Sequence, residues 1–152
     1  MNDTHDVAVL AYVAGLLDGE GSICIGSGRS RSDRVAPSYW LQVGITNTDR
    51  SLIDWLLATF GGHISDNSHA PSRKNQRPCW AWRIMGLQAV PFLEAIQPYV
   101  RVKAPQLCLA LDFQRHMSVV RAYRRVPAAH LVLREDFRQR LQALNRGTGT
   151  AD

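Results

Sequence analysis

An apolar segment over residues 7–21 constrains the possible folds most strongly, because it ends in two carboxylates set between glycines. Its composition predicts a helix. A helix C-terminus carries about half a negative charge, so Asp18 and Glu20 are unfavourable there unless a cation offsets them. A bound metal ion would supply that positive charge.

Small residues form a stripe along the same helix, with Ala11, Gly15 and Gly19 at every fourth position. An interior glycine costs a helix about 1 kcal/mol relative to alanine, which indicates that another backbone approaches this face closely. Two copies of the helix that touch along the stripe would place their terminal carboxylates side by side over a shared cation. A buried core helix followed by an Asp-Gly turn is the alternative.

The string from Val13 to Gly21 reads Val-Ala-Gly-Leu-Leu-Asp-Gly-Glu-Gly, which closely resembles the signature of the LAGLIDADG homing endonucleases. It departs by Val for the first Leu, Leu for Ile, Gly for the second Ala and Glu for the second Asp. The two apolar exchanges keep an apolar side chain. Glu20 keeps the carboxylate and moves it by one methylene.

The motif occurs once in the chain, which is typical of the small, homodimeric members of the family. One chain supplies only half of the carboxylate pair, and a closed two-fold contact between two copies would complete it. The predicted dimer interface comprises Ala11, Gly15, Asp18 and Gly19.

Bulk properties bound the class of protein. The length of 152 residues favours a single domain, over residues 1–146, with residues 147–152 as a tail. A net charge of +5 favours a polyanionic partner. No apolar run approaches the roughly 18 residues of a membrane span, and the N-terminus has no secretion signal. We expect no membrane or small-molecule partner, and a soluble, intracellular protein of a bacterial cytoplasm or an organelle matrix.

The three cysteines have no zinc-finger spacing, and the histidines match no metal-binding motif. Alternating apolar residues predict two strand pairs, and helical spacing predicts the segments between and after them. The strands are expected at residues 22–26, 39–46, 63–68 and 79–85, and the further helices at 52–60, 87–97, 105–118 and around 137–144. This order is that of an α+β fold. The resemblance implies a helix-strand-strand-helix-strand-strand-helix unit with an extra C-terminal helix, whose curved antiparallel sheet straddles double-stranded DNA.

The outward face of the strands and the basic connections between them hold the predicted DNA contacts, because a β-ribbon fits the major groove and arginine binds phosphates and guanine. On the first strand pair these residues are Ser22, Cys24, Gly26, Arg29, Arg31, Arg34, Trp40, Gln42 and Gly44. On the second they are His63, Ser65, Asn67, Arg73, Lys74, Arg77 and Arg83. For any single arginine, a solvated hairpin tip is the alternative.

The resemblance further implies metal-dependent hydrolysis of both DNA strands near the centre of a long pseudo-palindromic site. Glu20 matches the metal-binding acid of the family, and the carbonyl of Gly19 is placed to add a ligand. Asp18 is interpreted as a structural partner. Hard carboxylate oxygens suit Mg²⁺. We expect Mn²⁺ to substitute for it and Ca²⁺ to support binding without cleavage.

Three further residues complete the predicted active site. Asn47 matches the polar residue that orients water, with a plain helix cap as the alternative, and Lys103 matches the active-site lysine. A basic residue early in the second helix belongs in the same pocket, where the register leaves Arg50 and Ser51 open, and we choose Arg50. An intron RNA maturase and a non-catalytic DNA-binding regulator of the same fold are the rival functions.

Overall fold

The computed structural model describes residues 6–28, 36–67, 77–120 and 126–147. The elements within these ranges follow the expected order and confirm the α+β class: α1 (Val7–Glu20), β1 (Gly21–Gly28), β2 (Ser38–Asn47), α2 (Arg50–Phe60), β3 (His63–Asp66), β4 (Trp80–Met85), a 3-10 turn η2 (Gly86–Gln88), α3 (Ala89–Ile96), α4 (Ala104–Val120) and α5 (Ala128–Asn145). No helix in these ranges is long and apolar enough to cross a membrane.

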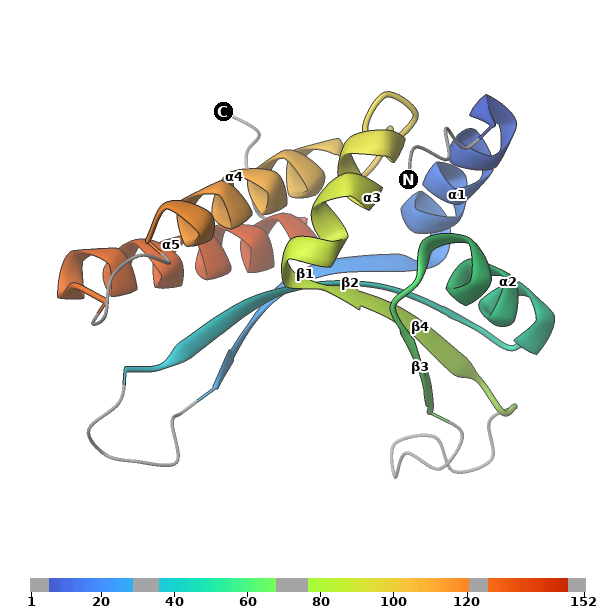
Figure 1. The fold of residues 1–152 in the computed structure, drawn as a ribbon, viewed down its shortest axis with the longest axis horizontal. Coiled ribbons are helices and arrows are strands. Elements are labelled where there is room, and N and C mark those ends of the chain that lie inside the picture. Colours follow the sequence, from blue (N-terminus) through green and yellow to red (C-terminus); the bar gives the residue numbers. More distant parts are fainter. Residues whose placement is uncertain (1–5, 29–35, 68–76, 121–125, 148–152) are drawn as a thin grey trace.

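The four strands form one antiparallel sheet in the order β1-β2-β4-β3. Figure 1 shows a curved, open sheet whose two hairpins spread apart, with the helices gathered on one face. The opposite face carries no helix, and we call it the open face. Because side chains alternate along a strand, the register decides which residues share that face.

The core lies between the helices and the sheet, where apolar side chains of alternate strand positions are buried. Ile23, Val43 and Ile84 occupy one row of paired positions and are almost fully buried. The predicted inward residues Ile25, Leu41, Ile45 and Trp82 are buried as well. The alternation read from the sequence therefore assigns the faces of these strands correctly.

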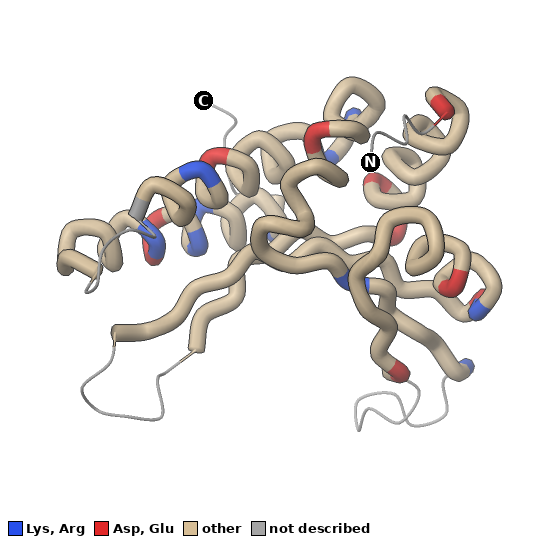
Figure 2. The backbone as a smooth tube through the Cα atoms, in the orientation of Figure 1, with Lys and Arg blue, Asp and Glu red and all other residues tan. Residues whose placement is uncertain are grey.

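Charge is distributed unevenly over the sheet. Strands β1 and β2 contain no charged residue, as Figure 2 shows, whereas β3 and β4 carry Asp66 and Arg83. Of the predicted tip cations, only Arg77 is described, and it is exposed. The others lie outside the described residues: Arg29, Arg31, Arg34, Arg73 and Lys74.

Local signals account for the ends of α2 and correct some predicted bounds. The Asp49 carboxylate caps α2 by accepting hydrogen bonds from the backbone N–H groups of Ser51 and Leu52. Gly61 ends the helix at φ 74°, a conformation that glycine adopts without strain. The predicted strand at 63–68 ends at Asp66, and the predicted helix at 87–97 begins with the turn η2, because Gly86 bends the chain at φ 56°.

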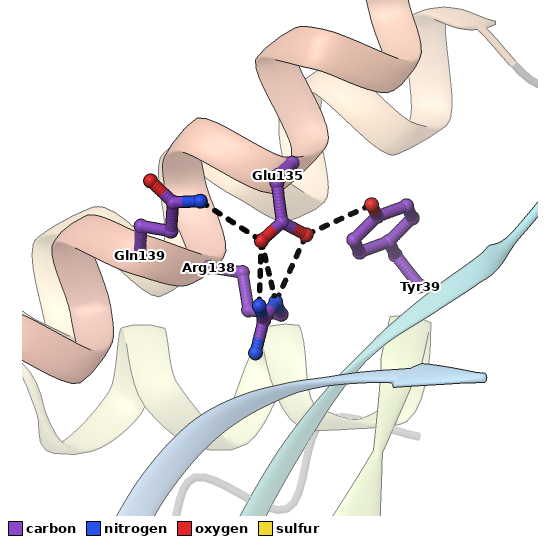
Figure 3. Close-up of polar contacts among 4 residues, drawn as sticks. All are labelled: Tyr39, Glu135, Arg138 and Gln139. Carbon is purple, nitrogen blue, oxygen red and sulfur yellow. Dashed lines mark hydrogen bonds and ion pairs between the residues drawn. The ribbon is translucent and has the colours of Figure 1, made fainter.

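The C-terminal helix is longer than predicted and is anchored to the sheet by a polar cluster (Figure 3). Glu135 of α5 accepts a hydrogen bond from the Tyr39 hydroxyl at 2.9 Å and binds Arg138 through both of its oxygens. Gln139 donates a further bond at 3.1 Å. The Arg138 hydrogen bonds, followed by those of Gln139 and Tyr39, lower the pKa of Glu135 from 4.5 to about 2.

Candidate active site and nucleic-acid interface

Glu20 and Asn47 meet where α1 and β2 end. Glu20 is the last residue of α1 and is exposed, while Asn47 is the last residue of β2. The pairing of β1 with β2 brings these two ends together. The Asn47 amide donates to Glu20 Oε2 at 2.5 Å, and its Oδ1 accepts the backbone N–H of Asp49 at 2.8 Å. Asn47 therefore orients the Glu20 carboxylate, and Asp49 caps the helix instead.

Asp18 binds the segment that precedes α4. Its carboxylate accepts backbone N–H groups from Arg101 at 2.8 Å, Val102 at 3.1 Å and Lys103 at 2.9 Å. Burial raises the pKa of Asp18. The three hydrogen bonds and the nearby Lys103 charge lower it by more, so the net shift of the pKa is downward. These N–H groups offset the Asp18 charge at the α1 terminus, which agrees with the interpretation of this residue as a structural partner.

Lys103 is brought to the same end of α1. Its ammonium donates to the backbone carbonyl of Asp18 at 2.5 Å, and the residue is half-buried. A cation at a helix C-terminus is electrostatically favourable. The structure thus gathers Glu20, Asn47 and Lys103 around the α1 C-terminus from three separate parts of the chain.

Neither candidate in α2 reaches this cluster. Arg50 Nε bonds Asp54 at 2.8 Å, and the guanidinium lies 5.8 Å from the centre of the Trp80 ring. Ser51 bonds Asp49 through its N–H at 2.8 Å and its hydroxyl at 2.6 Å. The described residues show no contact from either side chain to Glu20.

The α1 terminus carries some of the oxygen ligands that a metal site needs. Among the described residues, no three His, Cys, Asp or Glu side chains gather closely enough to hold an ion. Asp18 already accepts three N–H groups, so Glu20 is the carboxylate available at the α1 terminus, with the Gly19 carbonyl beside it in the chain. These hard oxygens suit Mg²⁺, which is commonly bound through one or two carboxylates and keeps several waters.

No described residue covers the small-residue stripe of α1. Ala11, Gly15 and Gly19 are exposed, and a Cβ added at either glycine would meet nothing within 4 Å. Two large apolar neighbours on the helix are also exposed, Val7 by 61% and Tyr12 by 53%. Exposed apolar patches of this kind often mark interaction sites.

The register places the predicted strand contacts on the open face. One row of paired positions runs through Ser22, Gly44, Arg83 and His63. Gly44 itself is buried, because Ser22 Oγ and Arg83 Cγ lie 3.6 Å and 3.4 Å from where its Cβ would be. Ser22 and Arg83 therefore form the surface there. The pKa of the Cys24 thiol, on the same face, is raised by burial although Arg83 opposes the shift.

The remaining predicted strand contacts lie on the same face or at its end. The open face holds Cys24, Gly26, Trp40, Gln42 and Ser65. Asn67 continues the second hairpin, with its N–H bonded to the Cys79 carbonyl at 3.0 Å. Met85 also lies on the open face, opposite Gln42. It is absent from the predicted contacts, although the alternation along the strand could have identified it.

Comparisons with known proteins agree with this geometry at the level of the fold. No protein-family model and no curated protein sequence matches the chain. Solved structures do match. The homing endonuclease I-CvuI has a TM-score of 0.75 at 16% identity, over 93% of this chain and 85% of that one. The archaeal intron-encoded homing endonuclease I-Vdi141I has a TM-score of 0.73 at 14% identity, over 90% and 84% of the two chains.

A third neighbour is larger. The LAGLIDADG homing endonuclease I-GzeII has a TM-score of 0.65 at 17% identity, and the match covers 85% of this chain but 43% of that one. The chain therefore has the fold of the LAGLIDADG homing endonucleases, as the string at residues 13–21 predicted. Its size is that of the single-motif type.

Proposed function

We propose that the protein is a site-specific, metal-dependent DNA endonuclease that cuts both strands near the centre of a long pseudo-palindromic target. The observation that carries the proposal is the Asn47–Glu20 hydrogen bond beside the exposed stripe of α1. It fixes an available carboxylate next to an exposed stripe of small residues against which a second copy could pack. The fold neighbours are homing endonucleases in complex with DNA, which supports the same function.

The proposed enzyme is a homodimer through α1. Two copies touching along Ala11, Gly15 and Gly19 would place one Glu20 from each chain near the two-fold axis. The match to less than half of the longer I-GzeII chain supports this arrangement, because that chain has room for two such units. A symmetric dimer would read a pseudo-palindromic duplex, since each half meets the same surface.

Divalent metal is part of the proposed chemistry. Glu20 and the Gly19 carbonyl of both copies would hold Mg²⁺, with Mn²⁺ as a substitute, and the ion would supply charge neutralisation and an acidified water. Asn47 keeps the Glu20 carboxylate in one orientation. Lys103 adds a positive charge where the scissile phosphate develops negative charge. I-CvuI complexes formed with Mg and with Ca ions support divalent-metal use.

A cleavage selection tests the proposal. The protein is incubated with a randomised duplex library in Mg²⁺, and the cut ends are sequenced, while a parallel sample in Ca²⁺ reports the duplexes that are retained. We expect one recurrent target with both strands cut in Mg²⁺ and intact in Ca²⁺. Retention of a target without cut ends in either metal would indicate a DNA-binding regulator instead.

A further inference from the structure

The Trp40 indole lies across strand β1 on the open face. A Cβ added to Gly26 would stand 2.6 Å from Cζ2 and Nε1 of Trp40, and one added to Gly28 would stand 3.3 Å from Cζ3. Any larger residue at Gly26 would displace the ring. The two glycines, which directly face Trp40 and Ser38 across the pairing, therefore leave the space that the indole fills.

This placement changes what the first hairpin presents to a ligand. Beside Gly26 the hairpin presents the indole of Trp40, and both residues are half-buried. The only donor of the ring, Nε1, is turned toward Gly26. Strands β1 and β2 carry no charge, and the indole is the large apolar group among the small and polar residues of this part of the open face.

The major groove of DNA offers one apolar group to such a surface. Adenine, guanine and cytosine edges present hydrogen-bond donors and acceptors, whereas thymine adds a C5-methyl group. We propose that Trp40 is a specificity-determining residue that contacts this methyl group, and that Gly26 and Gly28 are positioning residues that hold its ring. The inference rests on the proposed DNA-binding function.

The geometry also predicts where the methyl group lies. Glu20 directly precedes β1, and Gly26 lies six residues beyond it, roughly 20 Å away at about 3.3 Å per residue of extended strand. In the proposed complex β1 follows the groove outward from the cut bond beside Glu20. Successive base pairs are about 3.4 Å apart. The methyl-dependent position should therefore fall about six base pairs outward from the cut bond, once in each half-site.

The test replaces thymine by uracil, which removes only the methyl group. Each thymine of the selected target is exchanged in turn, and the affinity of the dimer is measured by fluorescence anisotropy in Ca²⁺. We expect about fourfold weaker binding at one position per half-site, because the exchange removes one buried carbon. Exchanges at the other thymines should change the affinity little. Trp40→Ala should bind the thymine and uracil duplexes equally at that position.

Two further variants test whether the position of the Trp40 ring determines the methyl dependence. Gly26→Val keeps the indole but displaces it, so it should lose the methyl dependence as well. Glu94→Gln changes an exposed side chain of α3, outside all predicted DNA contacts, and should retain it. Circular dichroism establishes whether the variants fold. If they do not, the uracil scan on the unaltered protein still shows whether a thymine methyl group is recognised at the expected position.

The outcomes distinguish this inference from the proposed function. If the selection retains no duplex in Ca²⁺, both are wrong. If a target is retained but shows no thymine preference near that position, or if Trp40→Ala weakens all sequences alike, only the role of Trp40 is overturned. Uniform weakening would indicate packing against the sugar-phosphate backbone instead.

Discussion

Glu20 is the residue on which the proposed chemistry depends most. Glu20→Gln keeps the shape and the oxygen that accepts the Asn47 amide, but removes the charge that would hold the metal. We expect single-turnover cleavage in Mg²⁺ to fall by about 100-fold or more, with binding in Ca²⁺ retained. Glu94→Gln, an exposed acid on α3, is the matched control and should cut normally. If Glu20→Gln cuts as fast as the unaltered protein, this carboxylate does not hold the metal.

The hydrogen bonds of Asp18 lead to a prediction about the stability of the single folded chain. Asp18→Asn places an NH₂ group against backbone N–H groups that the carboxylate now accepts. The free energy of unfolding should fall by about 1–3 kcal/mol, as expected for lost hydrogen bonds to a charged acceptor. Urea denaturation measures it. Asp112→Asn, which breaks an exposed ion pair on α4, should cost no more than about 1 kcal/mol.

The two acids also show what sequence could predict at this scale. Asn47 and Glu20 were identified singly through the resemblance, and the fold brings them within 2.5 Å. The partners of Asp18 lie 83 to 85 residues away and are backbone N–H groups, which every residue except proline carries. Nothing in the sequence marks them. The electrostatic conflict at the α1 terminus was visible, but its solution required the tertiary structure.

At the scale of elements, the strand faces were predictable and the helix docking was not. Alternation along β1, β2 and β4 assigns the buried rows correctly, because one side of the sheet must be apolar. The position of α5 instead depends on Tyr39, whose hydroxyl reaches Glu135 from the strand. That contact joins residues 96 positions apart, and the spacing of Phe137, Leu141 and Leu144 gives only the helix and its apolar face.

The Glu135 cluster predicts a pH dependence for α5 docking. The pKa of Glu135 is about 2 in the folded chain and 4.5 ordinarily, so between these values the unfolded state binds more protons. The contribution of Glu135 to the free energy of unfolding is complete above pH 4.5 and is lost as the pH falls toward 2. The stability difference between the unaltered protein and Glu135→Gln should therefore shrink across this window, as measured by chemical denaturation.

The neighbouring carboxylate provides the control for that measurement. Asp136 forms an exposed, 3.7 Å ion pair with Arg140 on the same helix. Asp136→Asn should change the free energy of unfolding by no more than about 0.5 kcal/mol. A Glu135→Gln difference that stays constant down to pH 2 would show that the cluster of Figure 3 does not stabilise the ionised carboxylate.

At the scale of the whole molecule, three features of the described residues fit the proposed dimer. They present a single available carboxylate at the α1 terminus, an uncovered apolar helix and a sheet with one bare face. The single motif predicts a homodimer, because a symmetric site needs two identical halves. The relative placement of two copies is a property of their contact, and neither the sequence nor one folded chain contains it.

Gly15→Leu tests that contact directly. Among the described residues, nothing outside the helix lies within 4 Å of a Cβ at this position, and leucine favours a helix more than glycine does, so the folded chain should lose no stability. In a dimer that packs along the stripe, each inserted side chain should cost about 1–3 kcal/mol by steric overlap. We expect a folded monomer by circular dichroism and light scattering, with cleavage lost. Ala58→Leu, an equally exposed site on α2, should leave the dimer intact. A Gly15→Leu protein that remains a stable dimer would show that the two copies meet elsewhere.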